Sequence, residues 1–383
     1  MSISPGRGFC LPFAGASIAR NDRGKHAMRI VKVESHVHRT PFTFGASAAG
    51  VGGNLHLRSM DTLLVRVETE CGLHGWGEGF GFTLVDTTRD ALDRLVAPVC
   101  IGEDARDIAG VGHRLQRRLH NFGRNGAASF AVAAIDIALW DIAAKAAGKP
   151  LHALLGDAAR DPVPAYASLL RYGNPDDVAR NTRAAVDAGY RRIKLHEVDL
   201  ACIRAARDAA PDDVPLMLDI NCAWNSVAEA RAFCAAVAGM NIAWVEEPVW
   251  PPEDFAAIAA VRTGGPCPIS AGECTGSVAE LRAMIAAGAV DVVQPSVSKL
   301  GLSAMLEVGA MARAAGIRMV PHSPYFGPGL LATLHLLAAG EVAEPIEIYA
   351  ADLARAPYGA ALVPVRGAIA VPQGPGLGLE PLP

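Results

Sequence analysis

Hydrophobic and polar positions alternate with two different periods along the second half of the chain. From Ala165 onward, short apolar runs are followed by longer Ala-rich stretches, such as SVAEARAFCAAVAG, in which apolar residues recur at helical spacing and a Gly ends the stretch. This order is typical of successive βα units, and Gly is the residue that helix C-caps favour. The predicted strands lie near residues 164–169, 191–196, 215–220, 242–248, 268–273, 290–296, 318–323 and 345–349. Eight strands with seven helices between them predict an α/β protein with a closed barrel that lacks its last helix.

The N-terminal part follows a different pattern. Three strand-like runs within residues 28–86 surround a Gly-rich loop at Phe44–Gly53, and helical periodicity follows to Ala147. A loop of this length is typical of a lid or a binding loop. The tail contains Pro and Gly in PQGPGLGLEPLP and is expected to be extended. The expected units are a disordered leader at 1–27, an α+β domain at 28–147, the barrel at 148–356 and a C-terminal segment at 357–383 that packs across the surface.

Three acidic residues each close an apolar run of the predicted barrel. Asp219, Glu246 and Glu273 end the runs PLMLD, IAWVE and PISAGE, and they recur at equal steps of 27 residues. Successive strand ends lie side by side in a parallel barrel, so the three carboxylates should converge at the face that carries the chemistry. Convergent carboxylates repel one another unless a cation lies among them, and oxygen ligands suit a hard ion. The sequence therefore predicts a Mg²⁺ site made of these three residues.

Composition narrows the choice of partner. A chain of 383 residues, 51% of them hydrophobic, can bury a large core, and a net charge of −4 without a dense Lys/Arg cluster disfavours nucleic-acid and membrane-surface binding. A small molecule is the expected partner.

The eight cysteines contain no C-x-x-C pair, which favours a reducing, cytoplasmic compartment. No uninterrupted apolar stretch reaches the length of a membrane helix, since the best candidate, Phe130–Trp140, contains Asp136.

Candidate acid–base residues lie at the ends of two other predicted strands. Lys194 and His196, in RRIKLHE, are two apart, so both side chains project to one side of the strand, while their apolar neighbours face the helices. His322, in MVPHSPYF, follows a strand on the opposite side of the barrel. Groups on opposite sides of a substrate can remove one proton and deliver another. The alternative is a surface lysine with structural, hydrogen-bonded histidines.

Several longer segments resemble the enolase superfamily, in the branch typified by mandelate racemase and muconate lactonizing enzyme. They are GWGEG at 75–79, AAIDIALWDIAAKAAGKPLHALLG at 133–156, KLH at 194–196, LDIN at 218–221, WVEEP at 244–248, GE at 272–273 and GPGLGLEP at 374–381. The resemblance, best to the mandelate racemase-like subgroup, spans nearly the whole chain after Met28. It implies an α+β capping domain over a modified TIM barrel, (β/α)7β, with the C-terminal segment packed back on the cap. It also implies Mg²⁺ on the three predicted carboxylates and a homo-oligomer.

The resemblance implies roles for individual residues. The substrate carboxylate would bind the metal, and a base would remove the neighbouring α-proton. Lys194 matches a lysine that contacts the carboxylate or the transition state, His196 falls where a second lysine is commonly the base, and His322 matches an acid or base on the seventh strand. Glu347, in EPIEIYA, matches a glutamate that can hydrogen-bond the substrate carboxylate.

Two positions depart from the family pattern. The histidine usually pairs with an aspartate on the sixth strand, but Ser296 occupies that position, and a serine orients an imidazole without favouring its charged form. His322 should therefore be near neutral or find another partner. Because His196 replaces a lysine, the base stays open among Lys194, His196 and His322, with Lys299 a weaker candidate.

The fate of the deprotonated substrate also stays open. Donation of a proton from His322 to a departing β-hydroxyl would make an acid-sugar dehydratase, which we favour because the missing aspartate weakens this histidine as an α-proton base. The polar residues His36, His38 and Arg39 also suit a hydroxylated or dicarboxylic substrate. Return of a proton to the α-carbon would instead make a racemase or epimerase of a hydroxy or amino acid derivative. A barrel that binds a small acid without turnover is the third alternative. Further substrate contacts are expected from Asn221 and Tyr325.

Overall fold

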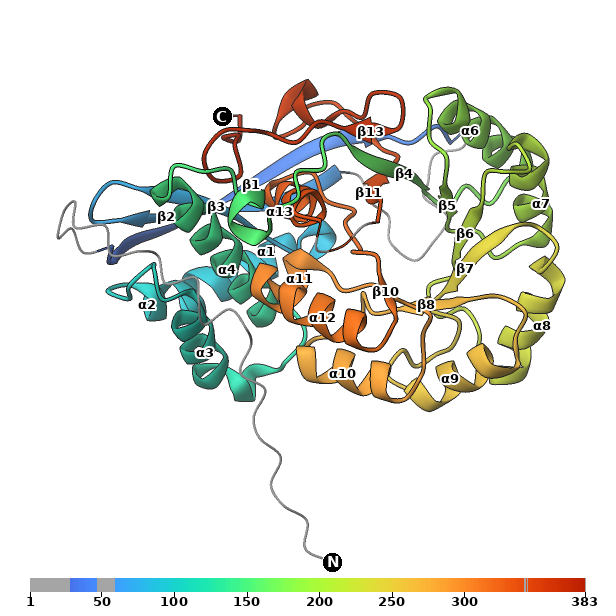
Figure 1. Cartoon of the computed structure of the whole chain (residues 1–383), viewed down its shortest axis with the longest axis horizontal. Helices are drawn as coiled ribbons and strands as arrows, with labels where there is room; N and C mark the ends of the chain where they lie inside the picture. The colour runs from blue at the N-terminus through green and yellow to red at the C-terminus, as the bar shows by residue number, and fades with distance from the viewer. Residues whose placement is uncertain (1–27, 47–58, 341, 343, 383) are drawn as a thin grey trace, which may run out of the picture.

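The computed structural model of the chain describes residues 28–46, 59–340, 342 and 344–382. The predicted disordered leader and most of the Gly-rich loop lie outside the described residues. Two sheets organise the rest: a four-stranded antiparallel sheet in the N-terminal part and a curled sheet of parallel strands in the C-terminal part (Figure 1). The predicted α/β class, with a modified TIM barrel and an α+β cap, is confirmed.

The cap consists of a sheet and a layer of helices. Its sheet has the order β12-β1-β2-β3 and contains β1 (Ile30–Thr43), β2 (Ser59–Thr69), β3 (His74–Gly79) and β12 (Asp352–Leu353). The helices are α1 (Val85–Ala91), α2 (Ala97–Cys100), α3 (Ile108–Arg118) and α4 (Ala127–Ala146). Apolar residues from the sheet and the helices form one buried cluster between the two layers.

Two glycines of the GWGEG segment allow β3 to contact α4 closely. A Cβ at Gly75 would lie 2.2 Å from the carbonyl oxygen of Ala138, and a Cβ at Gly77 would lie 1.9 Å from that of Ala134. Any side chain at these positions would push the strand away from the helix. The close approach explains why this part of the motif contains glycine.

Helix α4 is long and apolar enough to cross a membrane, by length and composition alone. However, 67% of its apolar window is buried inside the structure. It packs against β2 and β3 of the cap and against the barrel helices α11 (Val297–Leu300) and α12 (Leu302–Ala314). A helix that is apolar on all sides is expected at the centre of a large core, which is the position of α4.

The barrel contains all eight predicted strands, in the order β11-β4-β5-β6-β7-β8-β9-β10, and neighbouring strands are parallel. The strands are β4 (Val163–Leu169), β5 (Ile193–Leu195), β6 (Leu216–Asp219), β7 (Ile242–Glu246), β8 (Ile269–Ala271), β9 (Val292–Val293), β10 (Arg318–Met319) and β11 (Ile346–Tyr349). Between β10 and β11, the N–H of Ser323 donates to Glu347 Oε2 at 2.8 Å. The barrel interior is filled by Tyr166, Met217, Trp244, Val292 and Val320.

Helices cover the outside of the barrel (Figure 1). They are α6 (Pro175–Asp187), α7 (Leu200–Ala209), α8 (Val227–Val237), α9 (Phe255–Gly264), α10 (Val278–Ala286), α12 and α13 (Pro328–Ala338). Side chains that accept backbone N–H groups start five of them, at Asn174, Asp199, Ser226, Asp254 and Ser277. These caps fix the point at which each loop at the carboxyl end of a strand becomes a helix.

Two segments join the cap to the barrel. The end of β1 pairs with β12 and reaches towards the barrel (Figure 1), where Phe44 stacks on Tyr172 with ring centroids 5.9 Å apart. The C-terminal segment contains β13 (Ala368–Ile369), which pairs with β4, and further along the N–H of Leu377 donates to Asp141 of α4 at 2.7 Å. Through the contact of Phe44 with Tyr172, the start of the Gly-rich loop is held beside the first βα unit of the barrel.

Candidate active site at the barrel mouth

The three predicted metal ligands converge at the carboxyl ends of adjacent strands. Asp219 and Glu246 are register partners at the ends of β6 and β7, and Glu273 follows β8. One carboxylate oxygen from each residue lies within 4.8 Å of the others. Asp219 and Glu246 are fully buried, so their charges cannot be stabilised by water. This set of oxygen donors fits a hard divalent cation.

Lys194 supplies positive charge to this cluster. Its Nζ lies 2.8 Å from Asp219 Oδ2, 2.9 Å from Glu246 Oε1 and 3.2 Å from Glu347 Oε1. The ammonium group therefore acts as a stand-in for a cation between two of the predicted ligands. Burial opposes the charged form, but the surrounding carboxylates raise the pKa of Lys194 well above its ordinary value. A lysine held in the charged form is a poor base and suits a contact with a substrate carboxylate.

The three carboxylates differ in their preferred protonation states. Burial and the neighbouring charge of Asp219 raise the pKa of Glu246 to about 8. Burial would also raise the pKa of Asp219, but Lys194 and His196 hold it far below its usual value. His322 and Lys299 likewise outweigh burial and lower the pKa of Glu273 to about 2. A divalent cation would therefore displace a proton mainly from Glu246.

Neighbouring side chains orient the predicted metal ligands. Trp244 Nε1 and Gln294 Nε2 donate to Glu246 Oε2 at 3.1 and 3.0 Å. Asn221 donates to Asp219 Oδ1 from its backbone N at 3.1 Å and from Nδ2 at 2.8 Å. Asn221 was expected to contact the substrate, and the structure places it as a support of Asp219.

Two imidazoles approach the carboxylates from opposite parts of the barrel. His196, just after β5, has Nε2 3.3 Å from Asp219 Oδ2 and Nδ1 2.6 Å from the carbonyl oxygen of Leu169. His322, after β10, has Nε2 2.8 Å from Glu273 Oε2. Because a carbonyl oxygen only accepts, Nδ1 of His196 carries a proton, and Nε2 is the basic nitrogen of the neutral ring. Burial opposes the charge on His196, but Asp219 raises its pKa.

The position of the missing aspartate is occupied by a serine and a tyrosine. Ser296 Oγ lies 3.2 Å from His322 Nδ1 and also hydrogen-bonds the hydroxyl of Tyr325. The Tyr325 ring meets the His322 ring edge-on, with centroids 6.0 Å apart. Burial raises the pKa of Tyr325 well above its ordinary value, so the phenol is neutral. The imidazole is thus oriented without a carboxylate at Nδ1, and Glu273 is the other partner that it finds.

Two further predicted residues lie at the edge of the cluster. Glu347 contacts Lys194, and although burial opposes it, this ammonium lowers the pKa of Glu347. Lys299 donates to the carbonyl oxygen of Glu273 at 2.8 Å and lies 4.7 Å from the centre of the Phe80 ring. Lys299 therefore supports the loop that carries Glu273.

His36 and Arg39 contact other residues of the cap. The exposed His36 ring lies 6.0 Å from the ring of Trp76. Arg39 forms ion pairs with Asp61, at 3.1 Å, and with Asp86. The structure does not bring these two side chains into contact with the carboxylate cluster, so substrate binding by them stays a prediction.

Sequence reasoning overlooked several neighbours of the site. Tyr349 lies two residues after Glu347 on β11, and its ring meets that of His196 with centroids 6.2 Å apart. Cys222 Sγ lies 3.7 Å from Glu247 Oε2, and Cys274 Sγ lies 4.0 Å from Glu273 Oε1. The sequence could have indicated them, because each lies within three residues of a predicted site residue along the chain.

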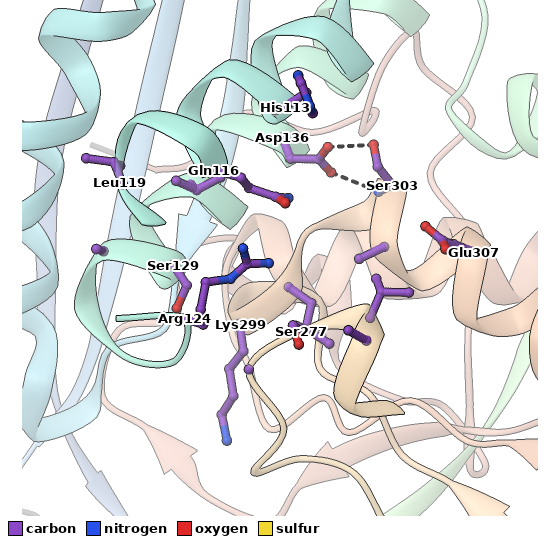
Figure 2. Close-up of a pocket in the computed structure, with 18 of the residues that line it drawn as sticks. His113, Gln116, Leu119, Arg124, Ser129, Asp136, Ser277, Lys299, Ser303 and Glu307 are labelled. Atoms are coloured by element: carbon purple, nitrogen blue, oxygen red, sulfur yellow. Dashed lines mark hydrogen bonds between the residues drawn. The ribbon is translucent and has the colours of Figure 1, made fainter. Parts of the chain in front are cut away.

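A cavity of about 380 Å³ lies away from this cluster, between α3 and α4 of the cap and α10 to α12 of the barrel (Figure 2). Its polar lining includes Gln116, Arg124 and Asp136, and both oxygens of Asp136 accept hydrogen bonds from Ser303. Lys299 also lines the cavity, but Figure 2 shows its amine pointing away from the other labelled residues. The cavity therefore borders the loop of Glu273 from outside and is distinct from the converging carboxylates.

Comparison with known proteins identifies the same architecture elsewhere. Residues 54–156 match the mandelate racemase/muconate lactonizing enzyme N-terminal domain, and residues 177–383 match the enolase C-terminal domain-like family. A D-galactarolactone cycloisomerase of Agrobacterium fabrum is 32% identical over 92% of this chain and 96% of that protein. A D-galactonate dehydratase of Verminephrobacter eiseniae is 32% identical, over 72% and 74% of the two chains.

A solved structure also matches over nearly the full length. The mandelate racemase/muconate lactonizing protein from Paracoccus denitrificans, complexed with magnesium, has a TM-score of 0.78 and 29% identity, and the match covers 93% of this chain and 96% of that one. Its bound magnesium agrees with the donor set described above, which could hold a divalent metal. The chain belongs to the mandelate racemase/muconate lactonizing enzyme branch of the enolase superfamily and is a lyase or an isomerase of that superfamily.

Proposed function

We propose that the protein uses Mg²⁺ to remove the α-proton of a sugar-acid substrate and then eliminates a β-oxygen. The observation that carries this proposal is the convergence of Asp219, Glu246 and Glu273 with an imidazole on either side. A bound Mg²⁺ would neutralise the negative charge that develops on the substrate carboxylate as the proton leaves.

Individual residues are assigned to substrate binding and to proton removal. Lys194, in its charged form, is the proposed contact of the substrate carboxylate. Glu347 orients this ammonium group as an anion, and it would hydrogen-bond the substrate carboxylate only after taking up a proton. His196 is the proposed base, because the carbonyl of Leu169 holds the proton on Nδ1 and leaves Nε2 facing the cluster. Its contact with Asp219 would be released when that carboxylate binds metal.

His322 is the proposed acid. Its Nδ1 contacts the neutral Ser296–Tyr325 pair, and its Nε2 faces the carboxylate cluster beside Glu273. A proton on Nε2 would therefore lie on the side from which it can be delivered to a departing oxygen. Elimination of a hydroxyl would give a 2-keto-3-deoxy acid, and elimination of a ring oxygen would open a lactone or an anhydro ring.

The relatives support a sugar acid as the substrate class. The dehydratase relative is named for D-galactonate and the cycloisomerase relative for D-galactarolactone. Racemisation is the second candidate, because imidazoles on both sides of the cluster can exchange protons with both faces of an α-carbon.

The test is a screen of acid sugars, sugar lactones and hydroxy acids with Mg²⁺ in D₂O. Elimination predicts a 2-keto product or a ring-opened acid, whereas racemisation predicts loss of optical rotation without a new functional group. Racemisation predicts Mg²⁺-dependent incorporation of deuterium at the α-carbon, whereas elimination predicts deuterium at C3 of the product, where the enol takes up a proton. A protein that binds these acids but incorporates no deuterium and forms no product with any of them would contradict the proposal.

A further inference from the structure

A second group of metal-type ligands lies beside the carboxylate cluster. Glu247, Glu273 and Cys274 each offer one atom, and these atoms lie within 4.8 Å of one another. Cys222 lies outside this group but contacts one of its members, since its Sγ lies 3.7 Å from Glu247 Oε2. Both cysteines are free thiols. Glu247 and the two cysteines have no role in the function proposed above.

Glu247 is the residue that points to a ligand. Its side chain is only 3% exposed, and its Oε1 accepts no hydrogen bond from any residue that the structure describes. A buried carboxylate oxygen without a donor is unfavourable unless a proton or a cation compensates it. The free oxygen therefore marks a place where a positive ion would be stabilised.

The backbone holds this group together. Glu247 and Cys222 have φ angles of +47° and +55°, in the left-handed region that residues other than glycine seldom adopt. The N–H of Cys222 donates to the carbonyl oxygen of Glu247 at 2.9 Å, which fixes the two loops side by side. On the third loop, Cys274 directly follows Glu273, with Sγ 4.0 Å from Oε1. Three neighbouring loops thus bring two thiols and two carboxylates together.

We propose that Cys222, Glu247, Glu273 and Cys274 form a second metal site for a thiophilic divalent cation such as Zn²⁺. A tetrahedral ion with Zn–S of about 2.3 Å and Zn–O of about 2.1 Å would separate sulfur and oxygen ligands by roughly 3.5 Å. The separations of Cys222 Sγ from Glu247 Oε2, 3.7 Å, and of Cys274 Sγ from Glu273 Oε1, 4.0 Å, are close to that value. Cys222 would have to move closer to Glu273 and Cys274 to complete the site. Binding would release a proton from each thiol to solvent and would use Glu273 as a bridge to the carboxylate site.

Ligand chemistry separates the two sites. Mg²⁺ prefers oxygen ligands, which Asp219 and Glu246 supply, whereas thiolates select softer ions. Saturating Mg²⁺ should therefore fill the carboxylate site and leave the sulfur-containing site for the second ion.

Co²⁺ is a suitable probe because its thiolate complexes absorb in the near ultraviolet. Added to the Mg²⁺-saturated, full-length protein, it should produce a thiolate-to-cobalt charge-transfer band that saturates at one equivalent and is abolished by excess Zn²⁺. Cys222→Ser and Cys274→Ser should each lose most of the band. Cys71→Ser, which alters an exposed thiol elsewhere, should retain it. Absence of the band in the native protein, or an unchanged band in both site variants, would overturn the proposal.

Two further measurements keep this test independent of variant folding and of the proposed function. X-ray absorption at the cobalt edge of the native protein should show sulfur neighbours, and a shell of oxygen and nitrogen alone would overturn the proposal. Glu246→Gln should lose Mg²⁺ binding but keep the cobalt band, because Glu246 does not belong to the sulfur-containing group. Loss of the band in that variant would show that the cobalt lies in the carboxylate site.

Discussion

Buried carboxylates occur both in the cap and in the barrel, but they are arranged differently. In the cap, Glu78 and Asp141 are 3% and 1% exposed, and each accepts backbone N–H groups from a distant segment. In the barrel, Asp219, Glu246 and Glu273 face one another within 4.8 Å. The cap acids join parts of the chain, whereas the barrel acids create a concentration of negative charge that a cation must offset.

Burial alone therefore does not identify a reactive carboxylate. Glu78 Oε2 accepts the N–H of Gly329 at 2.7 Å, so its hydrogen-bonding capacity is used within the fold. Glu246 receives donors at Oε2 from Trp244 and Gln294, while its other oxygen faces the ammonium of Lys194. A carboxylate is suited to hold a metal when one oxygen is oriented by hydrogen-bond donors and the other oxygen faces a cation.

Removing one charge from the barrel cluster should reduce activity more than any other change considered below. Glu246→Gln should abolish Mg²⁺ binding and lower kcat/KM by on the order of 10³-fold or more, because the metal supplies the main stabilisation of the developing charge. Isothermal titration with Mg²⁺ and steady-state kinetics would measure both effects.

The matched control for this change is Glu78→Gln in the cap. It is the same chemical substitution at an equally buried glutamate, so Mg²⁺ affinity should stay within about two-fold of the native value, as expected for a site that is not in contact with it. If both variants lost Mg²⁺ affinity equally, buried carboxylates of the cap and of the barrel would not differ in metal binding as we propose.

His322→Asn comes next in size. The variant should still bind Mg²⁺, because His322 contacts Glu273 but supplies none of the three carboxylates. Its turnover should fall by about 10²–10⁴-fold, the usual contribution of a positioned acid or base. Exchange of the α-proton with D₂O should persist in part if His196 is the base. Full turnover in this variant would remove His322 from the mechanism.

The sequence predicted the barrel site better than the contacts around it. The regular spacing of Asp219, Glu246 and Glu273 depends only on strand order, which repeats along the chain, and the structure brings these residues together. The pairing of His322 with Glu273 depends on side-chain directions across three strands, which no local pattern encodes. For the same reason the sequence did not predict that Asn221 donates to Asp219, while the substrate contact expected of Asn221 stays a prediction.

The cap was the harder region to predict in detail. The GWGEG segment indicated a family, but the reason for its glycines appears only when β3 is packed on α4. Asp141 lies within a segment that reads as an apolar helix, and its partners Trp76 and Leu377 lie far away along the chain. Contacts between such distant segments leave no periodic signal in the sequence.

A moderate effect on stability is expected at Asp141. Its two oxygens accept the N–H groups of Trp76 and Leu377 at 2.9 and 2.7 Å, and Lys145 lies 3.0 Å away. Asp141→Ala would leave buried donors without acceptors and should lower the free energy of unfolding by about 2–4 kcal/mol. Chemical denaturation would measure the change, and Mg²⁺ affinity of the folded variant should be preserved. A stability equal to that of the native protein would show that the segment after β11 is held mainly by other contacts.

The smallest effect is a pH dependence specific to the cap. Burial raises the pKa of Glu78 from an ordinary 4.5 to about 8. The folded state therefore retains this proton at pH values where the unfolded state has lost it, so the contribution to stability is complete below about pH 4.5 and declines as the pH rises to about 8. Glu78→Gln cannot ionise and keeps an oxygen for Gly329, so its unfolding free energy should fall less with pH than that of the native protein, by on the order of 1–3 kcal/mol. Urea denaturation of both proteins across this range isolates Glu78, because the barrel carboxylates titrate identically in both. Parallel stability curves would show that Glu78 is ionised in the fold and that the cap also tolerates a buried charge.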